Sequence, residues 1–183
     1  TSPDYYAGNN NSKTGYLVRK FVPDISDFPD YYNTGLNMIV MRYAEILLNF
    51  AEAKIELGQL DNSMYAAINE VRERAGMPAV DESIYNNQSS LQELVRRERR
   101  VELAMEGLRW FDIQRWRIGD EVMNGTVYGA RLGAVDPNTG EISLGTERIV
   151  VEERAFDPDK NYLWPVPQNV IDVNPNISQN PGY

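Results

Sequence analysis

Three glutamates spaced four residues apart form the densest group of chargeable side chains in this sequence. Glu98, Glu102 and Glu106 would lie on one side of a helix, because residues four apart are neighbours on a helix surface. Two crowded carboxylates can hold different pKa values, so that one acts as an acid and the other as a base, or they can share a metal ion. The spacing therefore suggests acid–base chemistry or a carboxylate metal site.

The charged residues around these glutamates support a second interpretation, in which the charges are structural. Arginine makes bidentate contacts to carboxylates, and a partly buried charge has to be paired. A glycosidase, by contrast, needs two carboxyl groups about 5–10 Å apart on either side of a sugar, and glutamates on one helix face do not flank a substrate in that way. We therefore interpret the group as a structural charge network and the protein as not an enzyme. Besides the three glutamates, the expected charge network includes Arg72, Arg109, Asp112 and Arg115.

A short run of oxygen-bearing side chains resembles the start of a calcium-binding loop. Asp157, Asp159 and Asn161 match the first three ligand positions of such a loop. However, Tyr162 stands where the loop needs glycine, and Gln168 stands where it needs glutamate. We expect a turn stabilised by aspartate side chains, and neither a metal site nor a cofactor.

Two loops near the amino terminus carry paired tyrosines beside amide side chains, which suits sugar binding. A sugar stacks its apolar face on a flat ring, and its hydroxyl groups bond to polar side chains. The alternative is that the rings only anchor the loops to the helices. The candidate ligand-binding residues are Tyr5, Tyr6, Asn9, Asn10, Tyr31, Tyr32 and Asn33.

The spacing of apolar residues predicts a helical framework behind these side chains. We expect a first helix over residues 40–57 and a second over 62–75, with Asp61 as the N-cap of the second and Gly76 after its end. The short connection makes the two helices pack together like one tetratricopeptide-type repeat. The expected core face of the first helix consists of Tyr43, Ile46, Leu47, Phe50, Ala51 and Leu57.

A third helix is predicted from Ser90 to Met105, because Ser90 and Glu93 form a capping-box pattern. A shorter helical segment follows over residues 108–116 and is expected to stop at Gly119. The expected apolar face of the third helix consists of Leu91, Leu94, Val95, Val101 and Met105.

Strand signals follow the helices. Residues 129–132 and 142–144 flank turn-forming residues and predict a small β-hairpin, with residues 149–151 as a candidate further strand. A short strand is also expected at residues 16–18, and a helical turn at 168–173. The fold class is therefore mainly α, with a helical pair, a third long helix, long loops and a small hairpin.

Composition narrows the classes of function. The 183 residues carry a net charge of −9, which opposes binding to nucleic acid or to an anionic lipid surface. The absence of cysteine and histidine excludes thiol nucleophiles, imidazole bases and Ser-His-Asp triads within this chain. We expect one domain, divided into an extended loop region (1–37), a helical core (38–119) and a hairpin with an irregular carboxy-terminal segment (120–183).

Several stretches of the chain resemble the SusD/RagB family in order and approximate spacing. Four residues that follow the third of these stretches fit the same pattern: Arg109, Asp112, Arg115 and Trp116. The matching strings are RYAEILLNFAEA (42–53), INEVRERAG (68–76), ERRVELAMEG (98–107), YLWPVP (162–167) and QNPGY (179–183).

The resemblance implies both a fold and a function. SusD/RagB-like proteins have tetratricopeptide-like helical pairs and are exported lipoproteins on the extracellular face of the outer membrane. There they cover a SusC-like TonB-dependent transporter and capture glycans, or peptides in RagB-like cases, without covalent chemistry. We therefore expect non-catalytic binding of an oligosaccharide or polysaccharide for delivery to the transporter. The alternatives are a peptide-binding member of the family and a protein-interaction scaffold that docks the transporter.

The chain departs from a whole family member in three ways. It has no signal peptide, no lipidation cysteine and no amino-terminal scaffold repeats. We therefore expect it to be the carboxy-terminal part of such a protein, which contacts the membrane only through a lipid anchor on the missing amino terminus.

Overall fold

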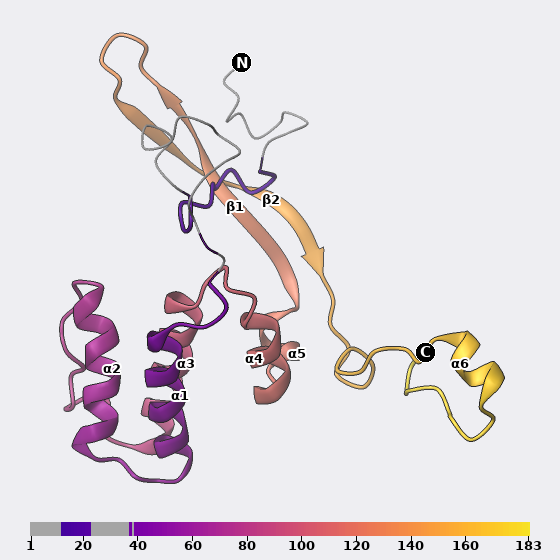
Figure 1. Ribbon diagram of the computed structural model, residues 1–183. Coiled ribbons are helices and arrows are strands. Elements are labelled where there is room, and N and C mark those ends of the chain that lie inside the picture. Colours follow the sequence, from indigo (N-terminus) through magenta and orange to yellow (C-terminus); the bar gives the residue numbers. More distant parts are fainter. Residues whose placement is uncertain (1–11, 23–36, 38) are drawn as a thin grey trace. The chain divides into compact units, whose positions relative to one another are not determined.

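The computed structural model describes residues 12–22, 37 and 39–183, and the chain divides into two compact units (Figure 1). The helical unit comprises Pro23–Asp112, and the hairpin unit joins Thr1–Val22 to Ile113–Tyr183. The subdivision of the chain that the sequence suggested stays a prediction.

Three helices lie side by side in the helical unit (Figure 1): α1 (Tyr43–Glu56), α2 (Asn62–Arg74) and α3 (Gln88–Glu102). Helices α1 and α2 form a hairpin around a short connection, and α3 packs against both. Leu48, Ile68 and Leu94, one from each helix, are almost fully buried in the common core. The predicted helical pair with a third long helix is confirmed.

The connection between α1 and α2 is fixed by the predicted N-cap. One carboxylate oxygen of Asp61 accepts hydrogen bonds from the backbone N–H groups of Ser63 and Met64, at 3.0 and 3.3 Å. The Nζ of Lys54 donates to the other oxygen at 2.5 Å. Two otherwise unsatisfied N–H groups at the start of α2 are thereby paired.

Replacing Asp61 with asparagine should lower the stability of the helical unit at neutral pH and leave it unchanged in strong acid. Hydrogen bonds from Lys54 and Ser63 hold the pKa of Asp61 below its ordinary value. The charge of Asp61 therefore stabilises the fold fully above the pKa of about 4 that this carboxyl has in the unfolded chain. This stabilisation is lost as the pH falls through the lower pKa of Asp61 in the folded state. Urea unfolding at a series of pH values checks this.

Asparagine also caps helices, so this substitution removes the charge and keeps the cap. Wild type and Asp61→Asn should differ most at neutral pH, and their curves should converge as the pH falls below about 4. A difference that does not change between pH 7 and pH 2 would contradict the prediction.

The buried face of α1 differs from the expected one. Leu48 and Ile55 are fully buried, whereas Tyr43 and Phe50 are 65% and 45% exposed. Apolar residues surround this helix on more than one side, so helical spacing alone does not identify the side that meets α2 and α3. The expected core residues Ile46 and Leu57 are exposed as well, whereas Ala51 is buried and Leu47 packs against the core.

Both ends of α3 also differ from the prediction. Asn87 is the N-cap, and its Oδ1 accepts a hydrogen bond from the N–H of Ser90 at 3.0 Å, so that Ser90 belongs to the first turn. The helix stops at Glu102, and Met105 has a left-handed φ of 64° that no α-helix contains. Met105, beyond the helix, and Val101, in its last turn, are both exposed, although Leu91, Leu94 and Val95 are buried as expected.

The hairpin unit is built on two antiparallel strands, β1 (Gly125–Val135) and β2 (Ile142–Arg154) (Figure 1). The hairpin is longer than predicted, because residues 149–151 continue β2 and do not form a separate strand. Residues 16–18 are not a strand. This loop has one backbone bond to β1, from the N–H of Ala130 to the carbonyl of Thr14 at 2.7 Å, which is too little for a ladder.

Three shorter helices complete the described chain: α4 (Arg109–Trp116), α5 (Gly119–Val122) and α6 (Gln168–Val173). The predicted turn at 168–173 is confirmed. Gly119 begins α5 instead of stopping α4, which ends at Trp116 and is followed by Arg117 with a left-handed φ of 52°. Gly119 is required there because a Cβ would overlap the ring of Phe156. Its N–H donates to the hydroxyl of Tyr162 at 2.7 Å.

Candidate functional site

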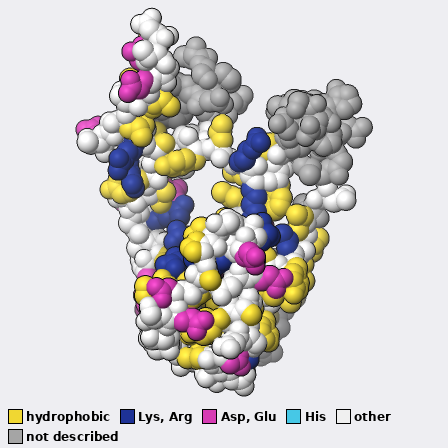
Figure 2. Space-filling view, turned by 90° about the vertical axis from the view of Figure 1, so that its left-hand side faces the viewer, with side chains coloured by type: hydrophobic (Ala, Val, Ile, Leu, Met, Phe, Trp, Pro, Cys, Tyr) yellow, Lys and Arg dark blue, Asp and Glu magenta, His cyan; other side chains and the backbone are white. Residues whose placement is uncertain are grey.

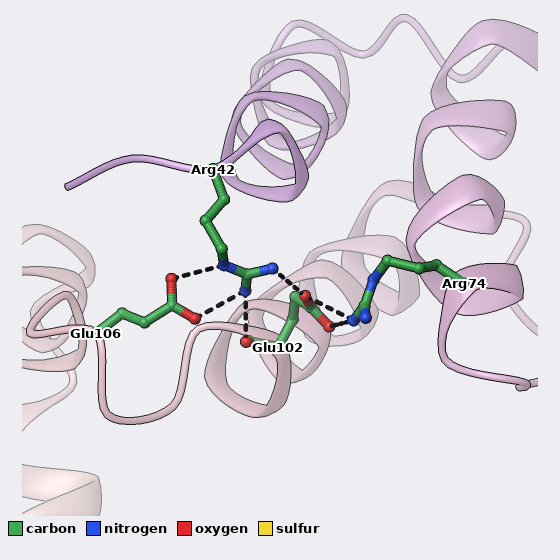
Figure 3. Close-up of polar contacts among 4 residues, drawn as sticks. All are labelled: Arg42, Arg74, Glu102 and Glu106. Atoms are coloured by element: carbon green, nitrogen blue, oxygen red, sulfur yellow. Dashed lines mark hydrogen bonds and ion pairs between the residues drawn. The ribbon is translucent and has the colours of Figure 1, made fainter. Parts of the chain in front are cut away.

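Arg42 joins two of the three glutamates that the sequence singles out (Figure 3). Its Nη1 donates to Oε1 of Glu102 at 2.7 Å, and its Nε and Nη2 donate to the two carboxylate oxygens of Glu106 at 2.8 Å each. Nη2 also donates to the backbone carbonyl of Glu102 at 2.8 Å. One guanidinium on the residue before α1 therefore holds the end of α3 and the turn that follows it.

Two arginines at the end of α2 bind the carboxylates of Glu98 and Glu102. Arg74 donates to both carboxylate oxygens of Glu102, at 2.9 and 2.8 Å (Figure 3). Arg72 forms an ion pair with Glu98, and its Nε donates to the carbonyl of Pro78 at 2.8 Å. The charge network therefore ties all three helices together at one end.

This geometry favours the structural interpretation over acid–base chemistry or metal binding. A guanidinium lies between the carboxylates of Glu102 and Glu106, where a shared cation would have to bind. The hydrogen bond to Glu106 raises the pKa of Arg42 above its ordinary value, despite the opposing effect of burial. The expected stack of three carboxylates on one helix is wrong, because α3 ends at Glu102 and Glu106 lies beyond it.

A second, more deeply buried charge cluster surrounds Arg99 on α3. Arg99 is 4% exposed, and its Nη1 donates to Oδ1 of Asn49 on α1 at 2.5 Å. Its Nε and Nη2 each lie 3.3 Å from an oxygen of Asp112, and its Nε lies 3.6 Å from Glu52. The cluster links α1, α3 and the first turn of α4.

The sequence interpretation named Asp112 but not its partners. One signal was present: Glu52 lies between Leu48 and Ile55 on the buried side of α1, and a carboxylate at such a position needs a cation. The residues that the sequence interpretation missed in the two clusters are Arg42, Asn49, Glu52, Arg74 and Arg99.

The two remaining arginines of the predicted network have other surroundings. Burial, followed by the charge of Arg100, lowers the pKa of Arg109, and Asp112 opposes this shift. The guanidinium carbon of Arg115 lies 4.6 Å from the ring centroid of Trp116 in the hairpin unit. Arg115 is therefore a cation–π partner of a neighbouring aromatic ring.

The sequence also suggested two other features: the paired-tyrosine loops and an aspartate-stabilised turn. The seven residues of the paired-tyrosine loops, from Tyr5 to Asn33, lie outside the described residues. The turn at Asp157 is confirmed, because its Oδ1 accepts from the N–H of Asp159 at 3.0 Å and its own N–H donates to Asn161 at 2.6 Å. Across residues 12–22 and 39–183, no group of three acidic residues is placed to hold a metal ion.

The two carboxy-terminal motifs bind each other. The side-chain amide of Gln179 pairs with both backbone groups of Val166, at 2.8 and 2.9 Å. Asn180 donates to the carbonyl of Trp164 at 2.6 Å, and the hydroxyl of Tyr183 donates to a carbonyl of the same segment at 3.1 Å. These bonds fix the backbone at Trp164, and the residue remains 74% exposed, so its aromatic side chain is presented at the surface.

The fold and the charge network define a class of protein: a mainly helical scaffold that has a tetratricopeptide-like helical pair braced by arginine–carboxylate clusters, together with a β-hairpin. The model of the SusD family matches residues 1–183. The chain belongs to the SusD family.

Relatives and solved structures agree with this assignment. SusD-like protein P2 of Formosa agariphila is 32% identical over 158 residues, which are 82% of this chain and 26% of that protein. A crystal structure of a SusD-like protein from Bacteroides fragilis has 38% identity and a TM-score of 0.67 over 80% of this chain and 26% of its own. This chain thus spans about a quarter of the proteins that it matches.

A second Bacteroides fragilis structure is that of a SusD-like carbohydrate-binding protein. It has 38% identity and a TM-score of 0.62 over 75% of this chain and 28% of its own. In the described parts of this chain, no helix has both the length and the apolar character needed to cross a bilayer.

Proposed function

We propose that this chain is part of a cell-surface protein that binds oligosaccharides without cleaving them. The observation that carries the proposal is the match of the SusD family to all 183 residues, in a family that includes a carbohydrate-binding protein. The engagement of Glu102 and Glu106 by Arg42 supports binding over hydrolysis, because hydrolysis needs one carboxyl group that can give up a proton.

The same membership supports a place and a partner for the whole protein. The protein would be held by a lipid anchor on the extracellular face of the outer membrane. It would pass its ligand to a SusC-like TonB-dependent transporter. The paired tyrosines near the amino terminus remain proposed ligand contacts, and Trp164 joins them, because an exposed aromatic ring on a fixed backbone can stack on the apolar face of a sugar.

Calorimetric titration with neutral and acidic oligosaccharides, and with short peptides as a parallel set, tests the proposal. We expect saturable heat with saccharides, and we expect the sugars to be recovered intact. Saturable heat with peptides alone would replace the glycan-binding proposal by the peptide-binding alternative. Release of shorter sugars would contradict the non-catalytic proposal.

A protein-interaction scaffold is a second candidate, which the exposed side of α1 favours. Tyr43, Ile46 and Phe50 form a row of exposed apolar side chains at helical spacing. Figure 2 shows hydrophobic side chains at the surface of the chain between acidic ones. If the scaffold function holds alone, no saccharide or peptide should bind, and Phe50→Ser should weaken docking to the transporter.

A further inference from the structure

The hairpin unit contains an open pocket that the candidate sites above do not include. The pocket has a volume of about 360 Å³, within the range of about 300–1,000 Å³ that is usual for small-molecule sites. Two arginines, one aromatic ring and two aliphatic side chains surround it, and none of the described residues that line it is acidic. We call it the hairpin pocket, and its lining consists of Tyr16, Ala130, Arg131, Leu144 and Arg148.

The two arginines of the hairpin pocket face each other across the strands. Arg131 on β1 is the direct partner of Arg148 on β2, so their side chains leave the same face of the hairpin. Both are exposed, and neither has an acidic partner among the residues that the structure describes. In Figure 2 the hairpin rises at the upper left, with basic side chains beside hydrophobic ones.

This arrangement is unfavourable without a ligand. Like charges directly opposite each other destabilise a strand pair. The chain has 27 acidic and 18 basic residues, so carboxylates that could neutralise the arginines are abundant elsewhere. An anion bound between the two guanidinium groups would remove the repulsion.

The backbone around the arginines is shaped to hold them. The strand register is irregular on both sides of the pair, between Tyr128 and Arg131 and again between Arg131 and Gly133. Such bulges redirect side chains and are frequent beside binding sites. Gly133 is needed at the second irregularity, because a Cβ there would lie 2.7 Å from the carbonyl oxygen of Ser143.

The aromatic wall of the pocket is also held in place. The carbonyl of Thr14 accepts a hydrogen bond from the N–H of Ala130, and a Cβ on Gly129 would lie 2.5 Å from that carbonyl oxygen. The hydroxyl of Thr14 accepts from the N–H of Tyr16 at 3.2 Å. The loop is thus fixed against β1, and Tyr16 lines the pocket while remaining exposed.

We propose that the hairpin pocket binds an acidic sugar, with Arg131 and Arg148 gripping its carboxylate or sulfate group and Tyr16 packing on the pyranose ring. Guanidinium groups match the planar, bidentate geometry of such anions, and aromatic rings match the apolar face of a sugar. The proposal rests on the proposed function and gives it a substrate class, namely anionic saccharides.

The test is calorimetry of the chain with three probes: trigalacturonate for the carboxylate, a sulfated carrageenan tetrasaccharide for the sulfate, and galactotriose as the neutral reference. At least one acidic probe should bind more tightly than the neutral one. Arg131→Gln with Arg148→Gln should weaken that binding by roughly tenfold or more and leave neutral binding unchanged. Arg154→Gln is the matched control, because Arg154 is an exposed arginine of β2 outside the pocket.

Arg148→Glu separates ligand binding from stability. It places opposite charges across the strands, so the hairpin unit should unfold at a higher temperature while acidic saccharides no longer bind. Equal binding of acidic and neutral probes, unchanged in the double variant, would overturn this proposal and leave the proposed function standing. Binding of no saccharide by this chain would overturn the hairpin-pocket proposal, and binding of none by the whole protein that contains it would overturn the proposed function as well.

Discussion

Replacing Arg99 with methionine should lower the free energy of unfolding of the helical unit by about 3–5 kcal/mol. Arg99 is buried between helices and forms ion pairs with Glu52 and Asp112, which are themselves 6% and 3% exposed. Removing it takes a buried, hydrogen-bonded cation away from two carboxylates in a water-poor environment, where the loss of one member of a charge cluster is strongly unfavourable. Urea unfolding followed by circular dichroism at 222 nm gives the change directly.

The neighbouring Arg100 provides a matched control, because it is exposed on the same helix. Arg100→Met should change the stability by no more than about 0.5 kcal/mol. Adding Glu52→Gln and Asp112→Asn to Arg99→Met should restore much of the loss, since the two side chains that lost the arginine are then neutral. If Arg99→Met and Arg100→Met had the same small effect, the cluster would not stabilise the fold.

The sequence predicted the elements that depend on local chemistry. The N-cap at Asp61 and the left-handed glycine at Gly76 are set by a few neighbouring residues, and both are as expected. The buried face of α2 likewise follows helical spacing, because buried apolar residues such as Ile68 and Val71 lie on one side of the helix.

Features that depend on distant residues were not predicted from the sequence. Arg42 and Glu102 are 60 residues apart, and nothing near either residue indicates which of the chain's arginines will pair with which glutamate. The prediction of the buried side of α1 is wrong for a related reason. Leu48 and Phe50 are both apolar, and only packing decides which of them faces the core. Pairing across the hairpin likewise brings Arg131 to Arg148, which their positions in the sequence do not suggest.

The capping error at α3 has a local cause. Asn87 and Ser90 are both good N-cap residues three positions apart, so two starts of the helix compete. The helix takes the earlier start, which lets the side chain of Gln88 reach the carbonyl of Ile55 at the end of α1, at 2.8 Å. A tertiary contact therefore decides between two caps of similar local strength.

Replacing Glu102 with leucine should destabilise the helical unit by about 2–3 kcal/mol and leave saccharide affinity within about twofold of wild type. The carboxylate of Glu102 accepts hydrogen bonds from both Arg42 and Arg74, so the substitution removes the link between them. The loss should be smaller than for Arg99→Met, because Arg42 keeps Glu106 as a partner and Arg74 is largely exposed. Denaturant unfolding and calorimetry on the same preparation measure the two quantities.

The comparison distinguishes the two interpretations of the glutamates. In the structural interpretation, Glu102→Gln should recover part of the stability, because its amide oxygen can still accept from an arginine. In a binding or catalytic interpretation, affinity would fall in a variant that remains folded, and glutamine would not restore it. The position of Arg42 between Glu102 and Glu106 favours the first result, because any ligand at these carboxylates would have to displace a guanidinium held by four hydrogen bonds.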